Sequence, residues 1–313
     1  MLNLILMDNL SKQLNNINSI VDLIGDTPLI KLNGFNGLSS DKQIFIKAEW
    51  FNPGGSIKDR AALSMIKDGI NKKKLNSKKT IMDSSSGNTA IAYAMIGSAL
   101  GFKVELVTPE NINIERKKTL QAYGAKIIYS SPFEGSDGAI LEARKMASKF
   151  PDKYFMPDQY NNEANPLAHY STTGPEIWDQ VDGKITHFIS GIGTSGTAMG
   201  TSKFLKEKNP NIKTIGVQPD NSLHGLEGLK HIPSSIVPGI YKESNLDEIF
   251  WANTEESYDV MEKLVKYEGM FVGHSGGAVV LAALEEIKKI EQAIVVCVIP
   301  DGGYRYLSGG VWW

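Results

Sequence analysis

A lysine directly after a glycine-rich turn is the first residue of this chain whose position suggests chemistry. The segment Asn52–Arg60 reads N-P-G-G-S-I-K-D-R, and its Pro53, Gly54 and Gly55 force the backbone to turn. Apolar residues at helical spacing follow, so Lys58 is predicted at or just before the first turn of a helix. The positive end of the helix dipole disfavours a cation there and lowers the pKa of an amine. A neutral amine is the form that makes a Schiff base with a carbonyl group.

A second candidate is the loop Gly191–Thr197, G-I-G-T-S-G-T, which follows a predicted strand and opens a predicted helix. Its glycines let the backbone approach an anion closely, and free N–H groups at the helix start bind the negative charge. The loop also matches the dinucleotide pattern G-x-G-x-x-G, and Asp220 lies about where a ribose-binding acid is expected. The hydroxyls within the loop favour a terminal phosphate monoester over a bridging pyrophosphate. The predicted phosphate ligands are Gly193, Thr194, Ser195, Gly196 and Thr197.

The polar loop Ser84–Thr89, S-S-S-G-N-T, also lies between a predicted strand and a predicted helix. One helix cap needs one such residue, whereas this loop has a run of them with a glycine inside it. Stacked N–H groups and hydroxyls at the start of a helix form a cradle for a carboxylate. The predicted carboxylate ligands are Ser85, Ser86, Gly87, Asn88 and Thr89.

Alternating strand and helix patterns would position these three loops. A chain of 313 residues can form two domains, and the alternation favours an α/β fold with two open, twisted, mostly parallel sheets and flanking helices. Strands are predicted at 28–32, 44–49, 80–82, 104–107, 125–129, 154–156, 186–189, 214–217 and 293–298. Helices are predicted after Lys58, at 89–100, 114–123 and 136–148, from 166, and at 196–206, 255–267 and 276–287.

Composition excludes several other classes of protein. The 33 basic and 35 acidic residues nearly balance, so nothing indicates electrostatic binding to nucleic acid or to a membrane. The single cysteine, Cys297, excludes an internal disulfide and a cysteine-rich metal site, and it suits a reducing cytoplasm; no metal is predicted. No apolar run reaches the roughly 18 residues that a membrane span needs. The first 20 residues lack the features of a signal peptide and are predicted to be a short extension.

The lysine segment closely resembles that of the fold-type-II pyridoxal-phosphate (PLP) enzymes, the cysteine synthase and cystathionine β-synthase family. The resemblance runs from about Ile24 to Ser308. Gly191–Thr197 resembles the loop with which this family binds the PLP phosphate, and Ser84–Thr89 resembles its T-S-G-N-T-G loop. Leu226–Tyr241 is most similar to the B-type branch of the cysteine synthases. The resemblance implies a tryptophan synthase β-like fold with the active site in the cleft between two domains.

The resemblance also implies roles for individual residues. Lys58 would bind PLP as a Schiff base and act as the general base, Asn88 would contact the ring oxygen, and Asp301 would lie near the ring. Ser275 would stand opposite the pyridine nitrogen. Because a serine hydroxyl does not keep that nitrogen protonated, the ring becomes a weaker electron sink, which favours β-elimination and replacement over transamination.

Two further residues are assigned to substrates by the resemblance. Gln159 matches a glutamine that reaches the substrate carboxylate. Lys230 stands where B-type relatives often carry arginine at the cleft entrance, and a cation there would favour an anionic substrate. The alternative for Lys230 is a surface charge that faces water.

The implied enzyme is a PLP-dependent cysteine synthase. It makes L-cysteine from O-acetyl-L-serine, or a related activated serine, and sulfide or another sulfur donor, through an α-aminoacrylate. Residues 1–25 would form the extension, 26–50 with 163–313 the larger, PLP-phosphate-binding domain, and 51–162 a smaller movable domain. Relatives suggest a cytoplasmic homodimer, with the tail of serine acetyltransferase as a partner.

Three alternatives stay open at this point. The first is a different reaction on the same fold, of the cystathionine β-synthase or serine/threonine dehydratase type. The second is an NAD-dependent oxidoreductase that uses the glycine-rich loop for a dinucleotide. The third is a non-catalytic docking role, against which an intact Lys58 argues. The residues do not identify the leaving group or the sulfur donor.

Overall fold

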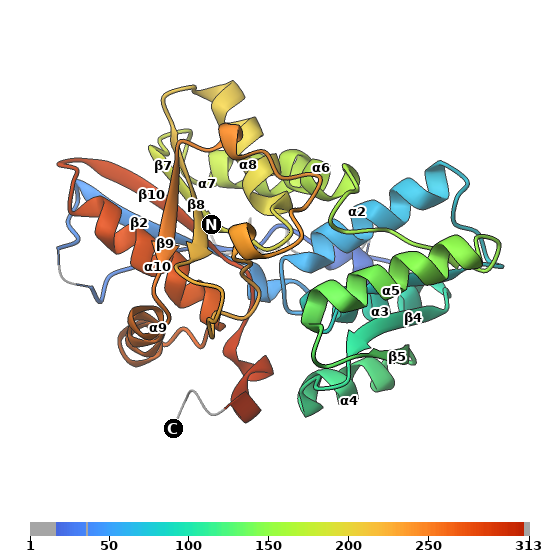
Figure 1. Cartoon of the computed structure of the whole chain (residues 1–313). Helices are drawn as coiled ribbons and strands as arrows, with labels where there is room; N and C mark the ends of the chain where they lie inside the picture. Colours follow the sequence, from blue (N-terminus) through green and yellow to red (C-terminus); the bar gives the residue numbers. More distant parts are fainter. Residues whose placement is uncertain (1–16, 36, 310–313) are drawn as a thin grey trace.

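A six-stranded sheet forms the centre of one of two lobes in the computed structural model, which describes residues 17–35 and 37–309 (Figure 1). The strands follow the order β1-β2-β10-β7-β8-β9, and all neighbours are parallel except the antiparallel pair β1 and β2. The bounds are β1 (Leu29–Lys31), β2 (Lys42–Ala48), β7 (His187–Gly191), β8 (Lys213–Pro219), β9 (Glu248–Ala252) and β10 (Ala293–Ile299).

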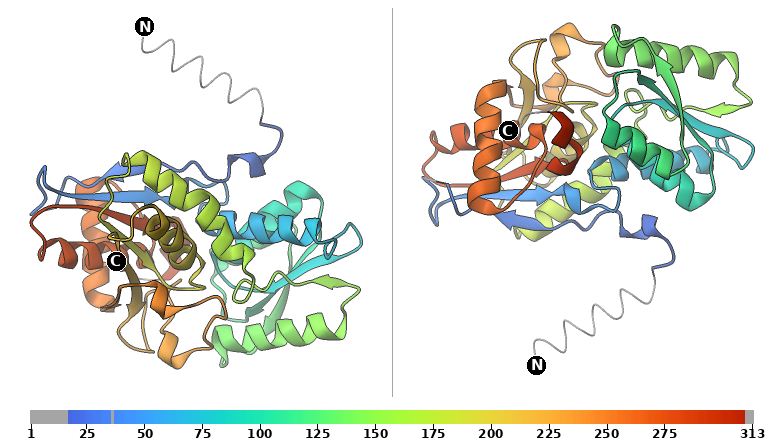
Figure 2. Two further views of the ribbon diagram at one scale, coloured as in Figure 1. Left: turned by 90° about the horizontal axis from the view of Figure 1, so that it is seen from above. Right: turned by 90° about the horizontal axis from the view of Figure 1, so that it is seen from below.

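A four-stranded sheet forms the centre of the other lobe, and all of its strands are parallel. Its order is β5-β4-β3-β6. The bounds are β3 (Thr80–Ser84), β4 (Val104–Pro109), β5 (Lys126–Ser130) and β6 (Tyr154–Phe155). The views from above and below show the two lobes side by side (Figure 2).

Helices cover both faces of each sheet because the strands are apolar on both sides. On the larger sheet, α9 and α10 pack against one face, and α7 and α8 against the other. On the smaller sheet, α2 and α3 cover one face and α5 the other. The bounds are α2 (Lys58–Asn71), α3 (Asn88–Leu100), α4 (Ile114–Ala122), α5 (Gly135–Lys149), α6 (Ala164–Ala168), α7 (Gly174–Gln180), α8 (Gly196–Lys208), α9 (Thr254–Glu268) and α10 (His274–Ile287).

Short helical turns complete the described chain. A π-helical turn, His169–Thr173, joins α6 to α7. The 3-10 helices are Ile20–Leu23, Glu49–Phe51, Ile232–Ser234, Glu243–Asn245, Gly303–Arg305 and Leu307–Gly309. Within residues 17–35 and 37–309, no helix is long and apolar enough to cross a membrane.

The α/β fold with two mostly parallel sheets, predicted from the alternation of elements, is confirmed. The strand predicted at 80–82 extends to Ser84, so the first serine of the polar loop is the last residue of β3. The edge strand β9 was not predicted, because its apolar run, Ile249–Ala252, is only four residues long and therefore a weak strand signal. Residues 1–16 of the predicted N-terminal extension lie outside the described residues.

A buried network of charges joins the first turn of α2 to the larger sheet. The guanidinium of Arg60 donates to both carboxylate oxygens of Glu49, at 2.8 and 3.0 Å, and to both of Glu176, at 2.5 and 2.7 Å. Lys47 adds a second cation 2.6 Å from Glu176. Burial lowers the pKa of Arg60, but the two carboxylates outweigh that effect and hold it above its ordinary value. Each buried charge therefore has a partner, as burial requires.

We expect Arg60→Ala to destabilise the fold strongly, because it leaves the buried carboxylate of Glu49 without its ion-pair partner. Breaking a buried pair in this way costs about 3–5 kcal/mol of unfolding free energy. Urea denaturation followed by circular dichroism measures the change. As a control, Lys266→Ala removes the exposed i,i+4 pair with Glu262 and should leave the unfolding midpoint unchanged. A loss below about 1 kcal/mol in Arg60→Ala would show that the network is not a major source of stability.

Candidate active site

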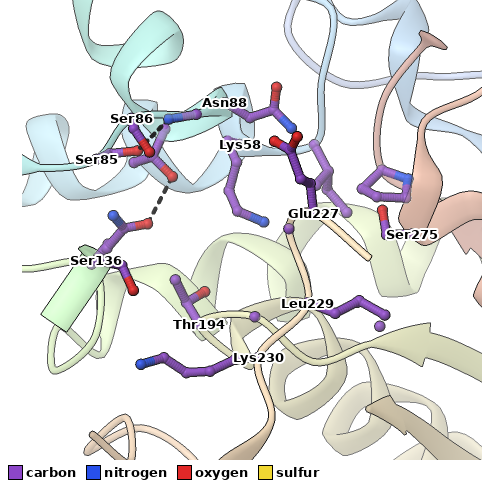
Figure 3. A pocket seen from close by; sticks show the side chains of 18 of the residues that line it. Lys58, Ser85, Ser86, Asn88, Ser136, Thr194, Glu227, Leu229, Lys230 and Ser275 are labelled. Atoms are coloured by element: carbon purple, nitrogen blue, oxygen red, sulfur yellow. Dashed lines mark hydrogen bonds between the residues drawn. The ribbon is translucent and has the colours of Figure 1, made fainter. Parts of the chain in front are cut away.

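A cavity of about 270 Å³ lies between the two lobes, at the carboxyl ends of strands from both sheets. Ser84 ends β3 and Pro109 ends β4 on the smaller sheet, whereas Gly191 ends β7 and Pro300 follows β10 on the larger one. Ligands of open α/β sheets bind at such strand ends, where backbone groups and helix starts face the same space. Figure 3 shows the side chains that line this cavity.

The turn before Lys58 is fixed by contacts that only glycines permit. Gly54 donates its N–H to Asp59 Oδ2 at 2.6 Å, and a Cβ on Gly54 would lie 2.4 Å from the other oxygen of that carboxylate. Gly55 has φ +76°, in the left-handed region that favours glycine. Burial raises the pKa of Asp59 to about 7. The turn therefore delivers the chain into α2 with Lys58 as the first helical residue.

The amine of Lys58 points into the cavity (Figure 3) and forms no hydrogen bond or ion pair with any residue that the structure describes. Burial lowers the pKa of Lys58, while the carboxylates of Asp301 and Glu49 oppose this shift through weaker charge interactions. The lowered pKa predicted from the helix dipole thus has burial as its main cause. The arrangement presents an amine that loses its proton more readily than one in water.

The loop Gly191–Thr197 lies against the opposite side of the cavity and leads into α8. A Cβ on Gly193 would lie 2.4 Å from the carbonyl oxygen of Gly228, so only glycine fits there. Ser195 has φ +75° and precedes the first turn of α8, and its hydroxyl is buried without a partner in the described structure. Thr194 Oγ1 accepts from Asn165 at 3.1 Å, so its own proton is available to a ligand. The loop has the backbone and hydroxyl donors that a phosphate needs.

His169 supports this loop from behind. Its Nδ1 lies 3.0 Å from Thr173 Oγ1, and its Nε2 lies 3.4 Å from Thr197 Oγ1. Burial, together with the charges of Arg60 and Lys58, holds the pKa of His169 well below its ordinary value. The ring is therefore a neutral hydrogen-bonding group that positions Thr197.

The loop Ser84–Thr89 closes the cavity on the side of the smaller sheet. Ser85 Oγ accepts from the N–H groups of Gly87 and Ala90, at 3.2 and 3.3 Å. Gln159 holds the two ends of the loop: its Nε2 donates to the Ser84 carbonyl at 2.9 Å, and its Oε1 accepts from Thr89 at 2.7 Å. The side chain of Gln159 thus shapes the predicted carboxylate cradle and also lines the cavity.

Asn88 begins α3 and is bound to the C-terminal segment of the chain. Its Nδ2 donates to Asp301 Oδ2 at 2.6 Å, and its Oδ1 accepts from Arg305. Asp301 also accepts from Tyr306, while its other oxygen is buried without a partner in the part of the chain described. Asp301 does not line the cavity. In this arrangement it orients Asn88, which does line the cavity.

Several serine hydroxyls line the cavity without hydrogen-bond partners in residues 17–35 and 37–309, among them those of Ser275, Ser190 and Ser84. Ser275 is the second residue of α10, and its side chain lies across the cavity from Lys58 (Figure 3). Ser190, near the end of β7, and Ser84, at the end of β3, each have a buried Oγ without a partner among the described residues. Buried hydroxyls are normally satisfied, so unpaired ones in a cavity indicate ligand-binding groups.

Lys230 lines the cavity and is only 9% exposed, so it is not a surface charge that faces water. Its ammonium lies 2.8 Å from Asp137 Oδ1, on α5 of the other lobe. A second ion pair crosses the cavity mouth, where Arg116 of α4 donates to Glu227 at 2.6 Å. Neither pair could be predicted from the sequence, because the partners are 93 and 111 residues apart and meet only in the folded chain.

Most of the predicted site residues meet in this cavity. Three of them do not line it, namely Ser195, Gly196 and Asp301. The cavity also contains residues to which the sequence analysis assigned no individual role, namely Ile57, Ser84, Pro109, Arg116, Ser136, Ala139, Tyr160, Ser190, Gly191, Glu227, Gly228, Leu229, Val298, Pro300 and Tyr306. The predicted residues that line it are Lys58, Ser85, Ser86, Gly87, Asn88, Thr89, Gln159, Gly193, Thr194, Thr197, Lys230 and Ser275.

Comparison with known proteins gives consistent matches along the chain. The family model described as "Pyridoxal-phosphate dependent enzyme" matches residues 20–301. A cysteine synthase from Aquifex aeolicus is 49% identical over 296 residues, which cover 93% of this chain and 90% of that protein. Cysteine synthase B from Pseudomonas aeruginosa is 41% identical, covering 94% and 97%. The crystal structure of a cysteine synthase from Entamoeba histolytica superposes with a TM-score of 0.89 at 35% identity, covering 95% and 90%.

We expect Lys58 to react with acetic anhydride at lower pH than an exposed lysine, because only the neutral amine is nucleophilic. The pKa of Lys58 is lowered by burial, whereas a hydrogen bond to Glu262 raises that of the exposed Lys266. Pulse labelling of the protein free of any bound small molecule, followed by mass spectrometry of peptides, gives both profiles in one sample. Coincident profiles, or a later rise for Lys58, would contradict the lowered pKa.

Proposed function

The chain belongs to the pyridoxal-phosphate-dependent enzymes, and from that premise we propose that it makes L-cysteine from O-acetyl-L-serine and sulfide. The reaction is a β-replacement. The bond between the β-carbon of the serine and the ester oxygen breaks, acetate leaves with that oxygen, and a C–S bond forms at the β-carbon. The observation that carries this proposal is the unpaired, buried amine of Lys58, which faces a glycine- and hydroxyl-rich loop across one cavity.

The residues that line the cavity fit PLP. The Lys58 amine would hold its aldehyde carbon, and Thr194, Thr197 and the N–H groups that open α8 would hold its phosphate. A Cβ at Gly193 would clash with the Gly228 carbonyl, which shows how closely the loop backbone packs where a phosphate would lie. The unpaired Ser275 hydroxyl supplies a neutral partner for a ring nitrogen.

Bound PLP withdraws electrons from the α-carbon of an attached amino acid and so stabilises the charge left when the α-proton departs. Lys58 is the residue placed to accept that proton. Because its pKa is lowered by burial, its amine is available as a general base nearer neutral pH than an ordinary lysine. The same group returns the proton after sulfur has added.

The carboxylate of the amino acid would be held by the loop Ser84–Thr89. The loop precedes α3, so its N–H groups and the helix dipole favour an anion there. Gln159 keeps the two ends of the loop in place through Ser84 and Thr89, and it lines the cavity itself. We infer that Gln159 acts mainly by shaping this cradle.

Ser275 supports β-replacement over transamination. A hydroxyl does not hold a proton on a pyridine nitrogen as a carboxylate does, so less charge is drawn from the α-carbon into the ring. The carboxylate of Asp301 does not replace Ser275 in this role. It accepts hydrogen bonds from Asn88 and Tyr306 and does not line the cavity.

We further propose how the chain is organised and where it acts. Residues 51–162 would form a smaller movable domain, and residues 26–50 with 163–313 the larger domain that holds the phosphate. The protein would act in the cytoplasm as a homodimer, and a serine acetyltransferase tail would dock at the cleft. The single cysteine is compatible with that reducing compartment.

The protein purified with PLP should be yellow and should release cysteine and acetate from O-acetylserine and sulfide. Lys58→Ala should abolish both the cofactor's visible absorbance band and turnover, because no other lysine can replace the amine at that position. Borohydride reduction followed by peptide mapping identifies the attached lysine. Labelling of a different lysine, or cysteine formation by Lys58→Ala, would refute the assignment.

Thr194→Ala combined with Thr197→Ala should weaken PLP retention, because two hydroxyl donors to the phosphate are lost. Each lost hydrogen bond to a charged group costs about 1 kcal/mol or more, or at least fivefold in the dissociation constant. Ser202→Ala, which removes a buried, unpaired hydroxyl further along α8, serves as the matched control and should retain PLP normally. Tight NAD binding by the unaltered protein would support the dinucleotide alternative instead.

A further inference from the structure

The ammonium of Lys230 is held in the cavity wall by one carboxylate. It lies 2.8 Å from Asp137 Oδ1, and the Lys230 side chain is 10% exposed against 33% for Asp137. The Lys230 backbone is also fixed, because its N–H donates to the Ile192 carbonyl within the phosphate loop segment at 2.8 Å. The charge of Lys230 is therefore compensated within the cavity wall.

Asp137 is itself held firmly. Its second oxygen accepts from the N–H of Ile236 at 2.9 Å. Both carboxylate oxygens therefore contact the segment 230–236 of the larger lobe. It lies in the first turn of α5, where the helix dipole favours a negative charge. The position of the carboxylate is thus fixed by its contacts with Lys230 and Ile236.

The other cation of the cavity mouth is compensated in the same way. Arg116 is paired with Glu227 at 2.6 Å, in the same segment of the larger lobe that carries Lys230. Of the lysines and arginines that line the cavity within the described residues, only Lys58 has no carboxylate partner. A dianionic ligand would thus find a reactive amine but no free cation at the entrance.

We propose that Asp137 determines which sulfur donor the enzyme accepts. By pairing with Lys230 it withholds a cation from the cavity, so sulfide is preferred over a bulkier dianionic donor such as thiosulfate. This inference rests on the proposed cysteine synthase function and deepens it. Asp137 acts through Lys230 and does not line the cavity, so it is a positioning residue for donor specificity.

Asp137→Asn tests the proposal, because it removes the negative charge but keeps a side chain of the same size. The freed ammonium should raise the ratio of kcat/KM for thiosulfate to kcat/KM for sulfide by about tenfold, the usual effect of one charge-assisted hydrogen bond. Calorimetric titration with sulfate, an unreactive dianion, should show binding about tenfold tighter than in the unaltered protein, at one ionic strength.

Two further variants separate charge from shape. Asp137→Asn with Lys230→Met should return both quantities to the unaltered values or below, since the freed cation is gone. Asp247→Asn, which removes a carboxylate paired with Lys206 and the N–H of Thr214 elsewhere on the larger lobe, should change neither.

The outcomes distinguish the two proposals. An unchanged ratio and unchanged sulfate affinity in Asp137→Asn, in a sample that still forms cysteine from sulfide, would overturn the role of Asp137. A raised ratio that persists in the double variant would also overturn it, because loosening of the Ile236 contact would then be the cause. Absence of cysteine formation with any donor in the unaltered protein would instead refute the cysteine synthase function.

Discussion

The position of the reactive lysine depends on the buried pairing of Arg60 with Glu49 and Glu176. A guanidinium taken out of water is stable only when its donors are satisfied, and here both carboxylates engage it in a two-pronged geometry. Both acids belong to the lobe of the six-stranded sheet, whereas Arg60 lies in α2 beside the four-stranded sheet. Because Lys58 is two residues before Arg60 in α2, the helix that carries the amine is joined to the larger lobe by this network.

The chemistry of the cavity follows from which of its charges have partners. Lys58 has none among the described residues, and burial lowers the pKa of its amine. Arg116 and Lys230 are each paired with a carboxylate of the opposite lobe, which compensates their positive charge. His169 has a lowered pKa because of burial and the neighbouring charges of Arg60 and Lys58, so its ring is neutral. Identical physical rules therefore produce a base, two structural ion pairs and a neutral hydrogen-bonding ring within one site.

Much of the fold and of the cavity could be predicted, because both are encoded locally. Glycine-rich turns before helices, as at Gly54 and Gly193, can be recognised from neighbouring residues alone. Contacts between residues far apart in the sequence could not be predicted. Arg60 and Glu176 are 116 positions apart, and no local sequence pattern near either residue indicates their ion pair. The placement of Asp301 behind Asn88, instead of in the cavity, likewise depends on tertiary packing.

The central strand β10 has a consequence for the redox behaviour of the protein. Its Cys297 is fully buried between β2 and β7, in register with Ile46 and Ile189, and burial raises the pKa of the thiol far above its ordinary range. Thiolates, not thiols, attack disulfides and persulfides. An enzyme that handles sulfide and releases a free thiol thus keeps its own single sulfhydryl inert. Mixed disulfides with cystine can form at Cys297 only after the six-stranded sheet has opened.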